Sequence, residues 1–346
     1  MKRTILIGSL ITAIICTLPW IVGVGKKAEA GLLSTKSHQA ENIAISPAIP
    51  ELLTDYVLIY NPQPDVYSGK STQTYISGKT YNQWQPNDHT FIAGPKGRWH
   101  CFGVTKPLEL PDERAYEAEG QQTFHALAPE GTLEQAFLPE TWIDQTKFSV
   151  AGSGESPYAI KIGKSYDLIS SSLGHASSKD LNKWKDNGRL QIKGAGRDPN
   201  ILYWNGTYYL VRCNGRTVNL VSSTDFENWT DPIDIFETPV GSWLCESPTL
   251  LRYEDSFYLF WCLWDSSPDR KKLLKLYKGH DPKNYDFRTF VYASDKPTDF
   301  NNREPIAKLK AHAPEIVVDE QGNYFISSAD YPRRGINLAR LGWKSE

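Results

Sequence analysis

Three carboxylates stand at the head of similar stretches of this sequence, and they are the residue type that acid and base chemistry needs. Asp88, Asp198 and Glu246 are these carboxylates, with Arg197 beside Asp198 and His89 beside Asp88. Two carboxyl groups can hydrolyse a glycosidic bond, because one stays protonated to give its proton to the leaving oxygen while the other, ionised, attacks the anomeric carbon or activates water. Crowding pushes the pKa values of neighbouring carboxylates apart, which creates an acid and a base from one chemical group.

Each of these stretches is one copy of a phrase that occurs five times. A polar opening is followed by a strand-like run, a short turn and a second run rich in Tyr, Trp and Phe. The copies span 88–105, 156–169, 198–211, 246–260 and 313–327. Turn residues such as Asn205-Gly206 stand at the centre of each copy, so each predicts a β-hairpin. The openings lie about 40 to 70 residues apart, the range of a four-stranded propeller blade.

The sequence therefore predicts an all-β fold, a five-bladed β-propeller over residues 81–346. Most copies of the phrase are followed by a third short segment, at 175–184 and 220–229 and more loosely at 276–285, which supports this fold. The residues repeated in these segments are interpreted as structural: His175, Asp180, Trp184, Asp225 and Trp229. A β-sandwich is the alternative, but it does not explain five copies of one phrase. Residues 31–80 carry no copy and are interpreted as an N-terminal strap that could supply a closing strand to the last blade.

In a propeller the first strand of each blade lines a central channel, so the five openings should converge. They are Asn87-Asp88-His89, Glu155-Ser156, Arg197-Asp198-Pro199, Glu246-Ser247-Pro248 and His312-Ala313-Pro314-Glu315. Structural interpretations remain open, since Asp-Pro often forms a turn and Asp88 could cap a strand. Glu246 follows an apolar run, where an unpaired carboxylate is costly without a purpose. Glu155 and Glu315 are weaker candidates.

Aromatic and histidine side chains are further candidates for contacts with a substrate. The tryptophans expected near the channel could stack on sugar rings, although core packing explains each of them equally well: Trp84, Trp99, Trp243 and Trp264. The histidines His89, His100, His125 and His312 have no zinc-ligand spacing, and no metal site is predicted from them.

The trio of Asp88 in Asn-Asp-His-Thr, Asp198 in Arg-Asp-Pro and Glu246 in Glu-Ser-Pro resembles the Asp, Asp, Glu set of the five-bladed propeller glycosidases, the grouping of glycoside hydrolase families 43 and 32. The intervals of 110 and 48 residues are similar too. The resemblance implies that Asp88 is the general base or nucleophile, that Glu246 is the general acid, and that Asp198 orients the substrate and tunes the acid.

The same resemblance implies substrate contacts for His89, Arg197, Trp264 and His312. No cofactor is required, although a central histidine helps to hold calcium in some relatives, which makes His312 the candidate for a structural calcium site. Asn87-Asp88-His89-Thr90 lacks the Pro-Asn-Gly of the fructose-acting family, and no second domain follows the fifth blade. These departures favour a family 43-like, inverting enzyme acting on arabinose, xylose or similar sugars; a retaining, fructosidase-like hydrolase is the alternative.

The first thirty residues are expected to direct export. Lys2 and Arg3 precede an apolar run to Gly25, and Ala28-Glu29-Ala30 is typical of a signal-peptide cleavage site. A secreted or periplasmic protein is therefore expected, with an uncleaved membrane anchor as the rival interpretation. The four cysteines after this segment, Cys101, Cys213, Cys245 and Cys262, could be bridged or free.

The formal net charge of −2 gives no reason to expect nucleic acid or an anionic membrane as a partner. An oligosaccharide or polysaccharide substrate is the expected partner. Two other function classes remain as hypotheses: a propeller that binds glycan without cleaving it, and a propeller that binds proteins. Converging carboxylates argue against both.

Overall fold

The computed structural model describes residues 46–63, 82–107, 122–145, 155–266 and 288–345. These residues belong to one compact unit, Ile45–Glu346. The predicted signal peptide and most of the predicted strap lie outside the described residues. None of the described residues forms a helix of the length and apolarity needed to cross a membrane.

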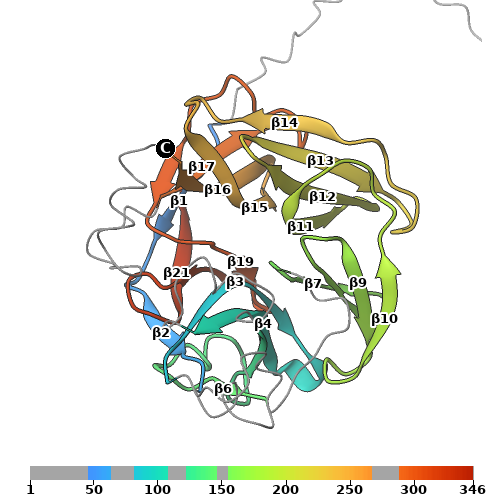
Figure 1. The fold of residues 1–346 in the computed structure, drawn as a ribbon. Helices are drawn as coiled ribbons and strands as arrows, with labels where there is room; N and C mark the ends of the chain where they lie inside the picture. Colours follow the sequence, from blue (N-terminus) through green and yellow to red (C-terminus); the bar gives the residue numbers. More distant parts are fainter. Residues whose placement is uncertain (1–45, 64–81, 108–121, 146–154, 267–287, 346) are drawn as a thin grey trace, which may run out of the picture. The chain divides into compact units, whose positions relative to one another are not determined.

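Five antiparallel sheets are arranged around a centre, which confirms the predicted five-bladed propeller (Figure 1). The first blade contains β3 (Trp84–Ala93), β4 (Trp99–Pro107), β5 (Gln122–Leu127) and β6 (Ile143–Asp144); a short 3₁₀ turn, η1 (Pro95–Gly97), joins its first two strands. The second contains β7 (Tyr158–Ile162), β8 (Ser165–Ile169), β9 (Gly174–Ser178) and β10 (Trp184–Arg189). The third contains β11 (Arg197–Trp204), β12 (Thr207–Asn214), β13 (Thr217–Ser223) and β14 (Ile233–Glu237).

The fourth blade contains β15 (Trp243–Tyr253), β16 (Ser256–Asp265), β17 (Thr289–Ser294) and β18 (Ala307–Leu309). Its third strand is β17, whereas the predicted segment 276–285 lies outside the described residues. In every blade the predicted hairpin is present, because an apolar run, a turn and a second apolar run pair locally without help from distant residues.

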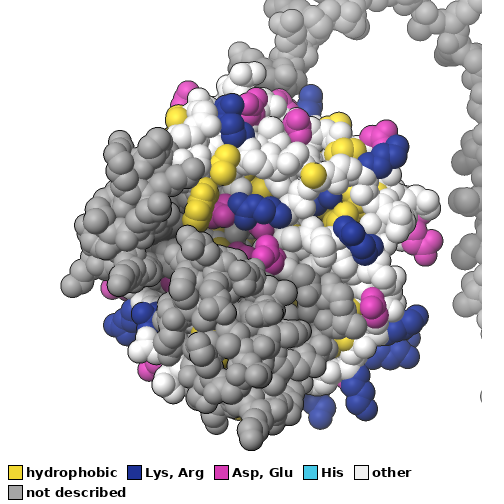
Figure 2. Space-filling model, in the orientation of Figure 1, with side chains coloured by type: hydrophobic (Ala, Val, Ile, Leu, Met, Phe, Trp, Pro, Cys, Tyr) yellow, Lys and Arg dark blue, Asp and Glu magenta, His cyan; other side chains and the backbone are white. Residues whose placement is uncertain are grey.

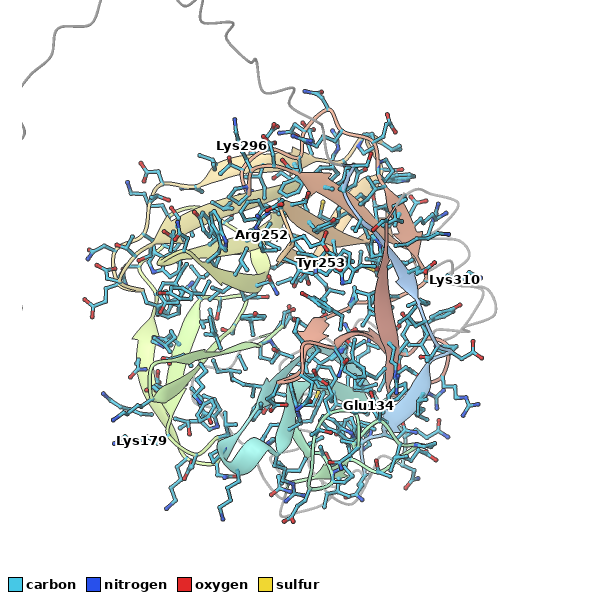
Figure 3. The ribbon with its side chains drawn as sticks, turned by 180° about the vertical axis from the view of Figure 1, so that it is seen from behind. Glu134, Lys179, Arg252, Tyr253, Lys296 and Lys310 are labelled. Atoms are coloured by element: carbon cyan, nitrogen blue, oxygen red, sulfur yellow. The ribbon has the colours of Figure 1, made fainter. Side chains whose placement is uncertain are left out.

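The fifth blade joins the two ends of the described chain. It contains β19 (Ile316–Val318), β20 (Tyr324–Ala329) and β21 (Ile336–Lys344), and β21 also pairs with β1 (Ile49–Leu52) and β2 (Val57–Tyr60). Two strands from the strap region therefore close the ring, so the propeller includes residues before position 81. Figure 3 labels Glu134, which forms an ion pair with Arg340 of β21 and ties the first blade to the last.

Apolar side chains fill the spaces between neighbouring blades. One buried cluster includes Phe102 of the first blade and Leu168 of the second, and another includes Ile169 of the second and Leu210 of the third. Similar clusters lie between the third and fourth, the fourth and fifth, and the fifth and first blades. Since each blade is apolar on both faces, burial of these faces holds the blades around the channel.

The outer turns of the second and third blades have the predicted structural role. Asp180 accepts hydrogen bonds from the backbone N–H groups of Asn182 and Lys183, and Asp225 accepts equivalent bonds from Glu227 and Asn228. Cysteine pairing, left open by the sequence, is also answered, because Cys101, Cys213, Cys245 and Cys262 are buried free thiols.

Candidate active site

In each blade one residue within or just before the innermost strand has a positive backbone φ, at the same place in every copy of the repeat. These bend residues are Asp88 (22°), Ser156 (51°), Asp198 (57°), Ser247 (44°) and Ala313 (45°). In the first, third and fourth blades the pairing register shifts at this point, as in a β-bulge. A bulge re-aims a side chain at the end of a strand, so the repeat directs five equivalent positions to one place.

Two adjacent pockets are lined by consecutive residues of these five openings. The channel pocket, of about 260 Å³, is lined by the residue before each bend residue, namely Asn87, Glu155, Arg197, Glu246 and His312, together with Asp88, Gln85, Val104, Thr105, Lys106 and Trp264. The inner pocket is lined by all five bend residues and the residues that follow them. Asp88 borders both. Figure 2 shows acidic and basic side chains together in a hollow of this face.

Asp198 is held by groups from three blades. Its Oδ1 accepts a hydrogen bond of 2.7 Å from the Ser156 hydroxyl, and its Oδ2 accepts one of 3.0 Å from the Ser247 backbone N–H. Arg197 Nη1 lies 3.1 Å from the same Oδ2. The side chain of Asp198 is only 4% exposed, so these contacts compensate for the loss of water and fix the orientation of the carboxylate.

Arg197 connects Asp198 to the third predicted carboxylate. Its Nη2 lies 2.8 Å from Glu246 Oε1 and also donates to the carbonyl oxygen of Cys245, at 3.3 Å. Burial raises the pKa of Glu246, and the negative charge of Asp198 adds to this effect, whereas Arg197 opposes it. Burial is the largest of these influences, so Glu246 holds a proton to higher pH than an ordinary glutamate.

Asp88 has a pKa raised to about 7. The largest cause is burial, followed by the negative charges of Asp198 and Glu246, while the Ser156 side chain and the charge of Arg197 act in the opposite direction. Three carboxylates therefore share one region with a single bridging guanidinium. Such a set cannot ionise independently, and its protons are lost in steps that belong to the group as a whole.

The structure places three of the predicted substrate contacts in the channel pocket. Arg197, Trp264 and His312 all line it. The His312 ring Nδ1 lies 3.1 Å from the carbonyl oxygen of Ala329. Because a carbonyl oxygen only accepts hydrogen bonds, Nδ1 carries a proton here. The assignment of these residues to substrate binding stays a prediction.

His89 has different surroundings. It is 3% exposed, its Nε2 lies 2.7 Å from the Ser327 hydroxyl, and it packs edge-on against Phe91. Burial lowers its pKa to about 3, so it is neutral at ordinary pH. His89 borders the inner pocket and not the channel pocket. These contacts favour a packing role over the predicted contact with sugar.

The other aromatic and acidic candidates are divided between the pockets and the core. Trp84 and Trp99 are buried in the cluster between the fifth and first blades, and Trp243 stacks on Phe290. Glu155 lines the channel pocket. Glu315 lines the inner pocket, and burial raises its pKa well above the ordinary value.

A calcium site at His312 was tested against the side chains around it. Calcium takes six to eight oxygen ligands. Among the described residues no group of three or more His, Cys, Asp or Glu side chains is arranged to hold a metal ion. No such cluster includes His312, and a calcium ion there stays a prediction.

Two residues of the site were given no role from the sequence. Ser156 was named among the converging openings, and it occupies the bend position in the second blade, between Asp88 and Asp198 in chain order. Lys106 comes from the second strand of the first blade and borders the channel pocket. No pattern in the sequence distinguishes it from other lysines, because its position follows from the pairing of Lys106 with Gln85.

Comparison with solved structures gives the same fold. An exo-1,5-alpha-L-arabinanase from a bovine ruminal metagenomic library matches with a TM-score of 0.50 and 15% identity over 74% of this chain and 92% of its own. A thermostable family-43 glycoside hydrolase matches with a TM-score of 0.52 and 11% identity over 77% and 91%. An endo-arabinase from Bacteroides thetaiotaomicron matches with a TM-score of 0.51 and 12% identity over 74% and 94%.

At these identities the likeness concerns the fold, and it confirms the predicted structural resemblance to five-bladed propellers of family 43. No protein-family model matches the sequence, and no curated protein matches it.

Proposed function

We propose that this protein is a glycoside hydrolase that cleaves O-glycosyl bonds in an oligosaccharide or polysaccharide. The observation that carries the proposal is the meeting of Asp88, Asp198 and Glu246 around Arg197, next to a pocket that also presents Trp264. Structural or protein-binding propellers have no use for carboxylates gathered at such a cost in desolvation.

Each carboxylate has a separate role in the proposed reaction. Glu246 gives a proton to the leaving oxygen; Arg197 holds its Oε1, which leaves Oε2 to carry the proton. Asp88, once ionised, takes a proton from the water that attacks the anomeric carbon. Asp198, fixed by Ser156, Ser247 and Arg197, stabilises the positive charge that develops on the sugar ring and keeps the pKa of Glu246 high.

The proposed substrate is a chain of arabinose, xylose or similar pentoses, cleaved with inversion at the anomeric carbon. Two solved structures with this fold are an arabinanase and an arabinase, which supports this class. We further propose that residues 1–30 are removed as a signal peptide and that the mature protein acts outside the cytoplasm, since an exported enzyme has access to such polymers.

The test compares substrates with good and poor leaving groups. Nitrophenyl arabinofuranosides, xylosides, galactosides and fructose-type substrates are offered together with the matching oligosaccharides to the native protein, E246Q and D88N. Nitrophenolate leaves without a proton, so E246Q should lose about 10²- to 10⁴-fold on oligosaccharides but much less on nitrophenyl glycosides, whereas D88N should lose activity on both. Proton NMR of the first product formed should show the inverted anomer.

Two results would overturn the proposal. In the first, the native protein binds oligosaccharides but cleaves no substrate, and E246Q and D88N bind the oligosaccharides equally well. The second is cleavage that survives in both variants. The control is D234N, which removes one charge from the exposed surface of β14, and it should behave like the native protein.

A further inference from the structure

The Ser156 hydroxyl connects the two aspartates of the site. It donates a hydrogen bond of 2.7 Å to Asp198 Oδ1, and the same side chain lowers the pKa of Asp88. Ser156 is 6% exposed and lines the inner pocket with both aspartates. Asp88, Ser156 and Asp198 are the bend residues of the first, second and third blades. The serine therefore comes from the blade between those that carry the two aspartates.

We propose that Ser156 is a positioning residue of the hydrolase, whose hydroxyl holds Asp88 and Asp198 in the arrangement that bond cleavage needs; this inference rests on the proposed function. Ser156 itself touches neither the leaving oxygen nor the attacking water in this assignment. It acts through Asp198, whose Oδ1 it holds while Arg197 contacts Oδ2, and through Asp88, whose ionised form it favours.

The repeat shows that the backbone conformation at the bend position does not depend on a hydroxyl group. Ala313 takes the same bend position in the fifth blade with φ of 45°, so a methyl side chain fits this conformation without a hydroxyl. Ser247 takes it in the fourth blade, where the backbone N–H, and not the side chain, contacts Asp198. S156A therefore removes the hydroxyl at a position that tolerates alanine, and S247A removes a hydroxyl with no bond to either aspartate.

Several charged groups face Asp88, and all of them are retained in these variants. Asp198, Glu246 and Arg197 influence its pKa directly, Glu155, Lys106 and His312 line the channel pocket with it, and His89 and Glu315 line the inner pocket. Because none of them changes in S156A, a shift in the titration of Asp88 would come from the lost hydroxyl.

The first measurement needs no substrate. The carboxyl carbon of Asp88 is followed by carbon-13 NMR between pH 4 and 9 in the native protein, S156A, S156G and S247A, and its signal is assigned by its absence in D88N. The native midpoint should lie near pH 7. Loss of the hydroxyl should raise it by about 0.5 to 1 in S156A and S156G, while S247A should keep the native midpoint.

The second measurement is the dependence of kcat and KM on pH for the same four proteins. S156A should lower kcat by about 10- to 100-fold, the effect of losing a hydrogen bond to a charged group, with a much smaller change in KM. The rising limb of its pH profile should move to higher pH together with the NMR midpoint. In S247A this limb should stay in place.

The outcomes separate this inference from the proposed function. If the native protein cleaves no glycoside, the proposed function fails, and the NMR titration still shows whether the hydroxyl controls Asp88. If the native protein is active but either folded variant, S156A or S156G, has the native midpoint and native kcat, the positioning role of Ser156 is overturned. Equal shifts in S156A and S247A would overturn it as well, because they would show a general effect of the bend position.

Discussion

Replacement of Asp88 by asparagine should stabilise the folded protein at neutral pH while it abolishes hydrolysis. The pKa of Asp88 is about 7 in the folded chain, against 3.8 for the ordinary group. Between these values the folded chain binds more protons than the unfolded chain, so the free energy of unfolding falls as the pH rises from about 4 to about 7. Each difference of one in pKa is worth about 1.4 kcal/mol, which sets an upper limit of roughly 4 kcal/mol at pH 7.5.

The expected gain is smaller than this limit. Asp198 and Glu246 share the titration with Asp88, and Asp88 as a residue is only partly buried, so we expect D88N to gain about 2 kcal/mol at pH 7.5. At pH 4.5 only about a quarter of the gain should remain, because Asp88 is then protonated in the folded chain and partly protonated in the unfolded chain.

Urea unfolding of the native protein, D88N and D234N at the two pH values measures this difference. D234N changes one exposed charge on β14 and should leave the free energy of unfolding within about 0.5 kcal/mol at both pH values. A D88N protein that is no more stable than the native protein at pH 7.5 would refute the reasoning. So would a gain that is equally large at pH 4.5, since this would show an effect of packing and not of ionisation.

Three further predictions concern catalysis. The value of kcat/KM should rise through about pH 7 as Asp88 loses its proton, and D198N should move this limb to lower pH because the negative charge of Asp198 raises the pKa of Asp88; a pH profile with an unmoved or raised limb would contradict this. W264A should raise KM more than it lowers kcat, since Trp264 lines the channel pocket; steady-state kinetics that show the reverse would place it in the chemical step. G103A should lower kcat/KM by about tenfold and reduce the melting temperature, because the added Cβ would clash with the Phe124 ring and lie 2.9 Å from the backbone oxygen of Asp88. Native kinetics and a native melting temperature would show that this part of β4 yields without moving Asp88.

The sequence predicted the parts of this fold that depend on local pairing. Each hairpin combines two apolar runs with a turn such as Asn205-Gly206, and these signals act within about fifteen residues. The carboxylates Asp88, Asp198 and Glu246 were predicted for the same reason, because the repeat aligned them before any distance was known. The closing strands β1 and β2 have no partner nearby in the sequence, so their bounds follow only from pairing with β21.

Side-chain direction was the part that the repeat did not predict. His89 follows Asp88 directly and was expected to contact the substrate; it borders the inner pocket and not the channel pocket, and its ring packs against Phe91 and Ser327. Lys106 reaches the channel pocket from a second strand, whose side-chain direction depends on its register with β3. The direction of these side chains is set only by the pairing between strands.

The bend residues show how a symmetric backbone acquires asymmetric chemistry. Positive φ in a residue other than glycine is often found at active sites, where strain is retained for function. Here the same conformation occurs in the fifth blade at Ala313, which has no polar side chain. The bend therefore belongs to the propeller repeat, and by itself it gives no sign of catalysis. The side chains that the repeat places there do: aspartate in the first and third blades and serine in the second, with Arg197 and Glu246 one residue before the bend in the third and fourth blades. It follows that changes at Ser247 or Ala313 should chiefly affect folding, whereas changes at Asp88, Ser156 or Asp198 should chiefly affect the ionisation of the site.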